Sequence, residues 1–138
     1  MRRLDQRGVM AMQFCLVAVP LFTLIFAIFD LGRYAITLQS LRSLANAGAR
    51  AVMINCYTNS VILKNQPTGC TGDPLPTTAA KQAVAPFLFN GGLSPTLNVP
   101  ATASSPLVVT ASSPNFKMLM PVWGTTLNAP SVTTKIPF

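Results

Sequence analysis

The sequence has no histidine and no glutamate, and its only acidic residues are Asp5, Asp30 and Asp73. General acid–base catalysis relies mainly on His, Glu or Asp side chains, and metal sites need clusters of His, Cys or carboxylate ligands. This shortage excludes hydrolases with paired carboxylates, Ser-His-Asp triads and histidine-ligated metal centres. A free cysteine would be the best remaining nucleophile, but no His is present to act as its base. We therefore expect a protein that is not an enzyme and uses no cofactor.

Charge of either sign is absent from residues 9–29, where only Gln13, Pro20 and Thr23 interrupt an apolar series. At about 1.5 Å per helical residue this segment reaches roughly 31 Å, close to the thickness of a bilayer's hydrocarbon core. An uncharged stretch of this length is typical of a membrane-spanning helix rather than a buried soluble helix. We therefore predict a transmembrane helix over residues 9–29.

Three arginines precede this segment within a basic leader, residues 1–8: Arg2, Arg3 and Arg7. The positive-inside bias places the leader in the cytoplasm and everything after Asp30 outside. About 108 residues remain beyond the span, enough for one small extracytoplasmic domain.

Proline is almost absent from the first half of the chain, since none lies between Pro20 and Pro67. Apolar or small residues recur at alternating spacings of three and four beyond the span: Leu31, Tyr34, Leu38, Leu41, Ala45, Gly48 and Val52. This spacing predicts that the helix continues over residues 30–55 and presents one packing face. The result is one long helix over residues 9–55, with a kink expected near Pro20.

The rest of the chain predicts two shorter regions. Residues 56–95 read as a loop closed by a disulfide and a short helix over residues 78–89, with Thr77 or Thr78 as its N-cap. Residues 96–138 predict an antiparallel sheet of three or four strands, because apolar and polar residues alternate there. The strands are expected at these positions: 96–102, 107–111, 116–122 and 131–138. The predicted fold class is α+β, a long helix packed on a small antiparallel sheet.

The three cysteines divide by position. Cys15 lies within the span, where a small apolar role is expected. Cys56 and Cys70 lie outside it, in a compartment that permits oxidation. We predict a Cys56–Cys70 disulfide, worth about 3 kcal/mol on the chain-entropy estimate; two free thiols are the alternative.

The net charge of +7 comes from bases spread singly along the chain, without a basic run or interleaved aromatic residues. That pattern favours a solvated surface or anionic lipid headgroups over nucleic acid. Trp123, Phe116 and Phe138 are interpreted as packing residues rather than ligand contacts.

A cleaved secretory signal is one alternative for the N-terminus, but the apolar segment is longer than a usual signal core and no small-x-small site follows it. The order of basic tail, Gly8 and apolar helix, with Phe14 six residues beyond Gly8, resembles a type IV prepilin-like leader. Such leaders are cut on the cytoplasmic side, which implies processing between Gly8 and Val9. Gln13 and Phe14 complete the processing motif.

The resemblance extends along the helix, through Pro20, the Asp30-Leu31-Gly32-Arg33 step and the small-residue segment 46–51. This ordered set resembles the TadE/TadG-like pseudopilins of tight-adherence (Tad, or Flp) pilus systems. The match covers residues 8–52 well and the last third loosely. It implies helix contacts through these residues: Asp30, Gly32, Arg33, Gly48 and Arg50.

The family resemblance implies a pseudopilin, or minor pilin, that acts in assembly of a type IVc-like pilus through protein contacts. The implied partners are a prepilin peptidase, the major Flp-type pilin, a second TadE/TadG-like protein, the inner-membrane assembly platform and the lipid bilayer, with no nucleic acid. The implied location is the bacterial inner membrane, single-pass, with a periplasmic C-terminal domain that either stays there or enters the pilus. An uncleaved membrane-anchored adhesion or scaffolding protein is the alternative.

One departure from the family pattern concerns Gln13, where the family usually has Glu. In type IV pilin-like assemblies that Glu is thought to meet the new N-terminal amine of a neighbouring subunit. A buried ammonium needs an anionic partner to offset its desolvation, and Gln offers only a neutral oxygen. Either this subunit need not sit within a filament stack, which we favour, or its leader is not efficiently removed. Asp30 and Arg33 have a second interpretation as a surface pair that contributes about 0.2–0.5 kcal/mol.

Overall fold

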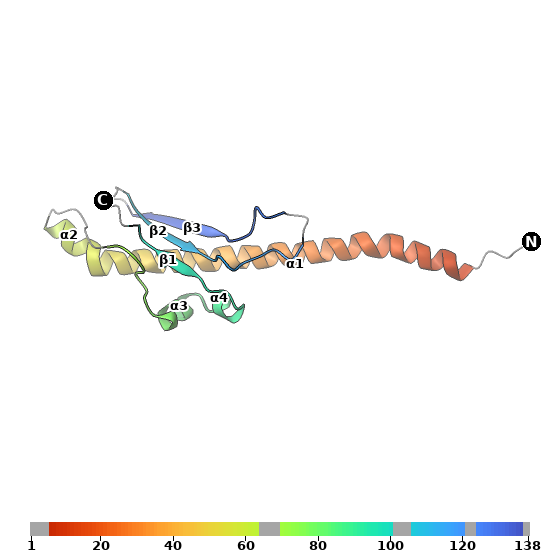
Figure 1. Ribbon diagram of the computed structural model, residues 1–138, viewed down its shortest axis with the longest axis horizontal. Coiled ribbons are helices and arrows are strands. Elements are labelled where there is room, and N and C mark those ends of the chain that lie inside the picture. Colours follow the sequence, from red (N-terminus) through yellow and green to blue (C-terminus); the bar gives the residue numbers. More distant parts are fainter. Residues whose placement is uncertain (1–5, 64–69, 101–105, 121–123, 137–138) are drawn as a thin grey trace, which may run out of the picture.

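The computed structural model describes residues 6–63, 70–100, 106–120 and 124–136. Its dominant element is the helix α1 (Gln6–Val52), which runs through Pro20 without interruption. Helical conformation continues past the predicted end, through a π-helical turn η1 (Met53–Tyr57) and a short helix α2 (Thr58–Ile62). Figure 1 shows α1 extending far beyond the rest of the molecule toward the N-terminus.

Three strands form one antiparallel sheet in the order β1-β2-β3: β1 (Thr96–Asn98), β2 (Leu107–Ser112) and β3 (Ser131–Ile136). In β2 buried and half-buried residues alternate, because successive side chains of a strand point to opposite faces. The pairing register places Leu97 and Val132 on either side of Ala111. The predicted α+β fold, a long helix on a small antiparallel sheet, is confirmed.

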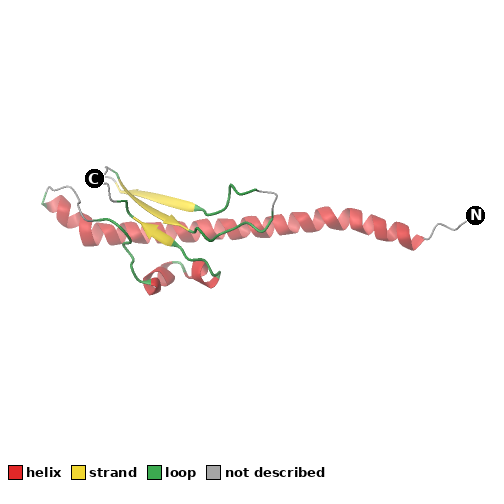
Figure 2. Ribbon diagram, viewed as in Figure 1, coloured by secondary structure: helices red, strands yellow, loops and turns green. Residues whose placement is uncertain are grey.

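The predicted second helix is two short helices, α3 (Thr78–Val84) and α4 (Pro86–Asn90). Thr77 caps α3, since its side chain accepts a hydrogen bond from the backbone N–H of Ala80 at 3.3 Å. The helices separate at Ala85 because Pro86 disfavours helical conformation at the residue before it. α1 contacts all three strands as well as α3 and α4 (Figure 2).

The core lies between the second half of α1 and the sheet. Six residues of α1 supply the helix side of this core at helical spacing: Leu41, Leu44, Ala45, Gly48, Ala49 and Val52. The expected packing face was correct from Leu41 onward. At its start it was wrong, because Asp30 and Thr37 are buried, whereas Leu31 is 38% exposed and Leu38 only half-buried. The helix there faces a loop rather than the apolar sheet.

The strand expected at residues 116–122 is not formed over residues 116–120; residues 121 and 122 lie outside the described part. The backbone N–H groups of Met118, Leu119 and Met120 bond to side chains instead of a neighbouring strand. Met118 donates to Asn128 Oδ1 at 2.9 Å, and Leu119 donates to Asp30. Phe116 is 1% exposed, as expected of a packing residue, while Trp123 and Phe138 lie outside the described residues.

Candidate functional site

The first half of α1 is an apolar surface that the described part of the chain leaves bare. The helix from Gly8 to Cys56 contains an 18-residue apolar window of which only 6% is buried. Within residues 9–29 all large apolar side chains except Ile25, which is partly buried, are more than half exposed: Val9, Met10, Met12, Phe14, Leu16, Val17, Val19, Leu21, Phe22, Leu24, Phe26, Ile28 and Phe29. A surface of this size is stable only when something other than water covers it.

The polar groups in this surface are few. The Thr23 hydroxyl donates to the backbone oxygen of Val19 at 2.7 Å, so it is satisfied within the helix. Gln13 lies exposed one helical turn after Val9, and Phe14 is 71% exposed beside it. Gly8 is also exposed, with open space around the position of a Cβ. The four residues of the predicted processing motif therefore lie together at the accessible start of the helix.

The apolar surface ends at Asp30, which is only 2% exposed. Its Oδ2 atom accepts two hydrogen bonds, from the backbone N–H groups of Leu119 and Met120, each at 3.0 Å. Its Oδ1 atom lies 3.7 Å from Nη1 of Arg33. Asp30 thus joins α1 to the long β2–β3 connection, residues 113–130.

Phe116 supports this junction from the connection's side. The Arg33 guanidinium lies over the Phe116 ring, 5.6 Å from its centroid, and the Tyr34 ring is 6.1 Å away at an angle of 51°. The base of the connection is closed by Ser113, whose N–H donates to the Pro130 oxygen at 3.0 Å. The interpretation of Asp30 and Arg33 as a mere surface pair is therefore wrong, because the carboxylate is buried against backbone donors.

Two of the three glycines in α1, Gly32 and Gly48, have opposite surroundings. A Cβ added to Gly48 would lie 2.7 Å from Cδ2 of Leu97 on β1, so glycine is what allows α1 and the sheet to approach closely. Around Gly32 there is open space. Arg50 is exposed on the side of α1 away from the core. Of the five predicted helix-contact residues, Asp30, Arg33 and Gly48 thus make contacts within their own chain.

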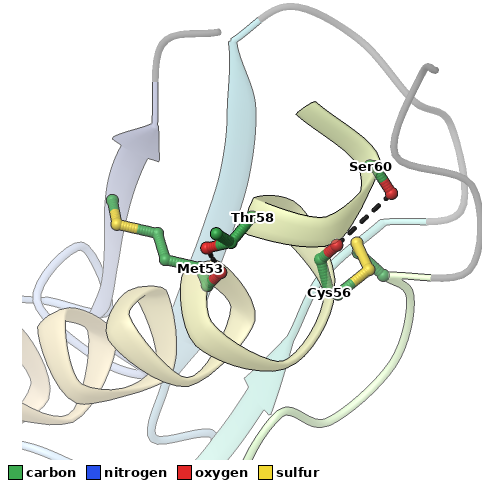
Figure 3. The surroundings of a disulfide bond; sticks show 5 residues. Met53, Cys56, Thr58 and Ser60 are labelled. Atoms are coloured by element: carbon green, nitrogen blue, oxygen red, sulfur yellow. Dashed lines mark hydrogen bonds between the residues drawn. A yellow bond between two sulfur atoms is a disulfide. The ribbon is translucent and has the colours of Figure 1, made fainter. Parts of the chain in front are cut away.

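The structure joins Cys56 to Cys70 by a disulfide, with their Cα atoms 5.7 Å apart. Cys56 lies in the π-helical turn η1, which begins at Met53. The Met53 oxygen accepts both the backbone N–H of Thr58 and its hydroxyl, the latter at 2.5 Å (Figure 3). Ser60 donates to the Cys56 oxygen at 3.3 Å.

The chain segment after Cys70 is fixed to the sheet by Gly72, which pairs with Val99 through two backbone hydrogen bonds of 2.9 and 2.8 Å. Asp73 bonds to Lys81 and accepts the N–H of Leu75 at 3.0 Å. Asp73 is therefore used to hold a loop against α3. Within the described part of the chain no three His, Cys, Asp or Glu side chains gather where a metal ion would bind.

These features define a class of protein: a small α+β domain carried on one long helix whose bare apolar half fits a single-pass membrane anchor. Residues 8–50 match the model of a family described as TadE-like protein. The comparisons with curated proteins and with solved structures gave no match.

The matched segment lies within α1, from Gly8 to Arg50 in the last turn of the helix. It contains the predicted processing motif, Asp30, Arg33 and Gly48. The resemblance to TadE/TadG-like proteins is confirmed over this segment, and it indicates a protein associated with a Tad pilus. Sequence reasoning missed residues 116–120 as part of the site, because backbone N–H groups carry no side-chain signal.

Proposed function

We propose that this chain is a pseudopilin, or minor pilin, which acts in assembly of a Tad pilus through protein contacts and catalyses no reaction. The observation that carries the proposal is the TadE-like match over residues 8–50, because it coincides with one continuous helix whose first half is bare. In this proposal lipid covers the apolar half of the helix in the membrane, and helices of neighbouring subunits cover it during assembly. The outer domain then presents a fixed surface for assembly.

The fixed relation between helix and domain supports this role. Asp30 binds the β2–β3 connection, and Asn46 accepts a hydrogen bond from the Thr134 hydroxyl of β3 at 3.2 Å. Gly48 keeps β1 close to the helix. A rigid attachment lets a push on the helix move the domain with it, which is what a subunit extracted from a membrane by an assembly machine requires.

The partners follow from the family resemblance and belong to the proposal. They are a prepilin peptidase, which would cut between Gly8 and Val9, the major Flp-type pilin, a second TadE/TadG-like protein and the inner-membrane assembly platform. The accessible positions of Gly8 and Val9 at the helix start are compatible with cleavage. We place the outer domain in the periplasm, because the basic residues of the leader favour the cytoplasm.

Deletion of the gene tests the proposal. We expect loss of surface fibres by electron microscopy and restoration by the full-length chain supplied in trans. The control is complementation with a chain that carries Leu24→Arg, because a charge at the centre of the span disfavours insertion by about 2.5–3.5 kcal/mol. Normal piliation in the deletion strain would overturn the pseudopilin proposal and favour an envelope adhesion or scaffolding protein.

A further inference from the structure

The β2–β3 connection reaches back along α1 to the point where the apolar surface ends. In Figures 1 and 2 it extends from the sheet toward the N-terminal half of the helix. Its residues 116–120 are held there by the two hydrogen bonds to Asp30, which directly follows Phe29 in the helix. Residues 116–120, called the junction loop below, therefore lie at the level where α1 would leave the hydrocarbon layer.

The junction loop presents an apolar side chain to the outside. Leu119 is 76% exposed, more than any other large apolar residue in the described part of the chain. Its backbone N–H is fixed on Asp30, so the exposed position is part of a tied conformation and not of a free end. Lys117 is exposed in the same loop, and the Arg33 side chain is 44% exposed beside it.

We propose that the junction loop is a second membrane contact, in which Leu119 inserts among the headgroups of the leaflet from which α1 emerges. Lys117 and Arg33 would then face anionic lipid phosphates, as basic side chains do at such surfaces. The inference rests on the membrane anchoring of the proposed function. It adds that the outer domain rests on the bilayer surface rather than standing clear of it.

The continuity of the apolar surface favours lipid over a protein as the occupant. Ile28 and Phe29, at the end of the span, are 61% and 67% exposed and lie one turn or less from Asp30. Lipid that surrounds these two residues reaches the junction loop without a gap. The basic charge of Lys117 complements an anionic leaflet, and no acidic side chain of the junction loop opposes it. The charge of Arg33 adds less, because the Asp30 carboxylate lies 3.7 Å from its Nη1.

Depth-dependent fluorescence quenching tests this inference on the full-length chain in phosphatidylcholine–phosphatidylglycerol vesicles. Cys15→Ser removes the free cysteine, so Leu119→Cys supplies one labelling site while the Cys56–Cys70 disulfide stays intact. Two matched positions carry the same label. Phe22→Cys reports the centre of the span, and Lys135→Cys reports an exposed site on β3, toward the far end of the sheet.

We expect quenchers near the headgroups to act at position 119 at least about twofold more strongly than at position 135, because an interfacial apolar group lies roughly 5–10 Å deep. Quenching at position 22 by deep quenchers alone, with none at 119, would overturn the inference and leave the anchor intact. Equal quenching at 119 and 135 would overturn it too. No quenching at position 22 would overturn the membrane anchor itself and the inference with it.

Discussion

At the scale of single residues, two glycines in the same helix show how the neighbouring atoms determine the effect of a Gly→Ala substitution on stability. Gly48 faces Leu97, which is 4% exposed, whereas Gly32 faces open space. Ala is about 1 kcal/mol better than Gly in a helix interior, so Gly32→Ala should raise the free energy of unfolding by about that amount. Gly48→Ala gains the same term but forces its Cβ into Leu97, and overpacking costs about 1–3 kcal/mol. We therefore expect Gly48→Ala to lower it by about 1 kcal/mol.

Thermal unfolding of the detergent-solubilised chain, followed by circular dichroism, measures both variants. Leu97→Val serves as the control background, because the shorter side chain makes room for the added methyl group. The cost of Gly48→Ala should shrink there, as expected for residues in direct contact. If Gly48→Ala proved as stabilising as Gly32→Ala, close helix–sheet approach at Gly48 would not be a constraint.

Asp30 marks the limit of sequence reasoning at this scale. Its position at the end of an uncharged segment predicts a membrane-boundary residue. Its spacing from Arg33 predicted an ion pair, which the structure contains at 3.7 Å. Its burial was not predictable, because the groups that bury it are backbone N–H donors 89 and 90 positions further along the chain. Every residue except proline carries the same backbone N–H group, so the sequence does not show which of them will bind Asp30.

At the scale of elements, the junction loop should depend on the Asp30 carboxylate. Hydrogen bonds to charged groups contribute about 1.5–3 kcal/mol each to stability. Asp30→Ala should therefore lower the free energy of unfolding by about 3 kcal/mol or more. Asp30→Asn keeps an oxygen that accepts both N–H groups, and we expect it to cost about 1 kcal/mol. Amide hydrogen exchange at Leu119 and Met120 is the direct measurement. It should accelerate strongly in the Ala variant and weakly in the Asn variant, whereas equal protection in the Ala variant and the natural chain would contradict the junction.

Helices were more predictable than strands in this chain for a physical reason. The long helix is specified by repeated local signals, namely the absence of charge, the absence of proline and a spacing of three and four. The α3 cap at Thr77 is local as well. The strand predicted at residues 116–122 is not formed over residues 116–120, because a strand also needs a neighbour with free backbone groups. Here Asp30 and Asn128 accept those hydrogen bonds.

The π-helical turn is a further feature that no local pattern announced. The Met53 oxygen accepts the Thr58 N–H five residues on, so η1 contains one more residue per turn than an α-helix would. An extra residue rotates every following side chain about the helix axis. Cys56 lies in this turn and bonds to Cys70, so the helix irregularity and the disulfide occur at the same place.

At the scale of the whole molecule, the two halves of α1 have different roles. The half beyond Asp30 carries the core, and residues 9–29 offer lipid or neighbouring helices an apolar surface with one amide, Gln13. If Val9 becomes the N-terminus, Gln13 follows it by one helical turn on the same face. We expect its neutral amide to bind the N-terminal amine of a neighbouring subunit more weakly than a carboxylate would.

Gln13→Glu should therefore increase the share of the chain found in sheared pili relative to the membrane fraction, by about tenfold if one charge-assisted hydrogen bond is gained. Gln13→Met is the matched control, since it keeps the side-chain length and removes the oxygen; we expect no increase in the share found in pili.

Intact mass in the presence of the peptidase should show loss of residues 1–8 in all three chains, so that cleavage and incorporation are measured separately. A Glu variant that is cleaved but no more abundant in pili would show that position 13 does not control entry into the filament. Retention of the leader in the natural chain, with its loss in the Glu variant, would instead assign Gln13 to inefficient processing.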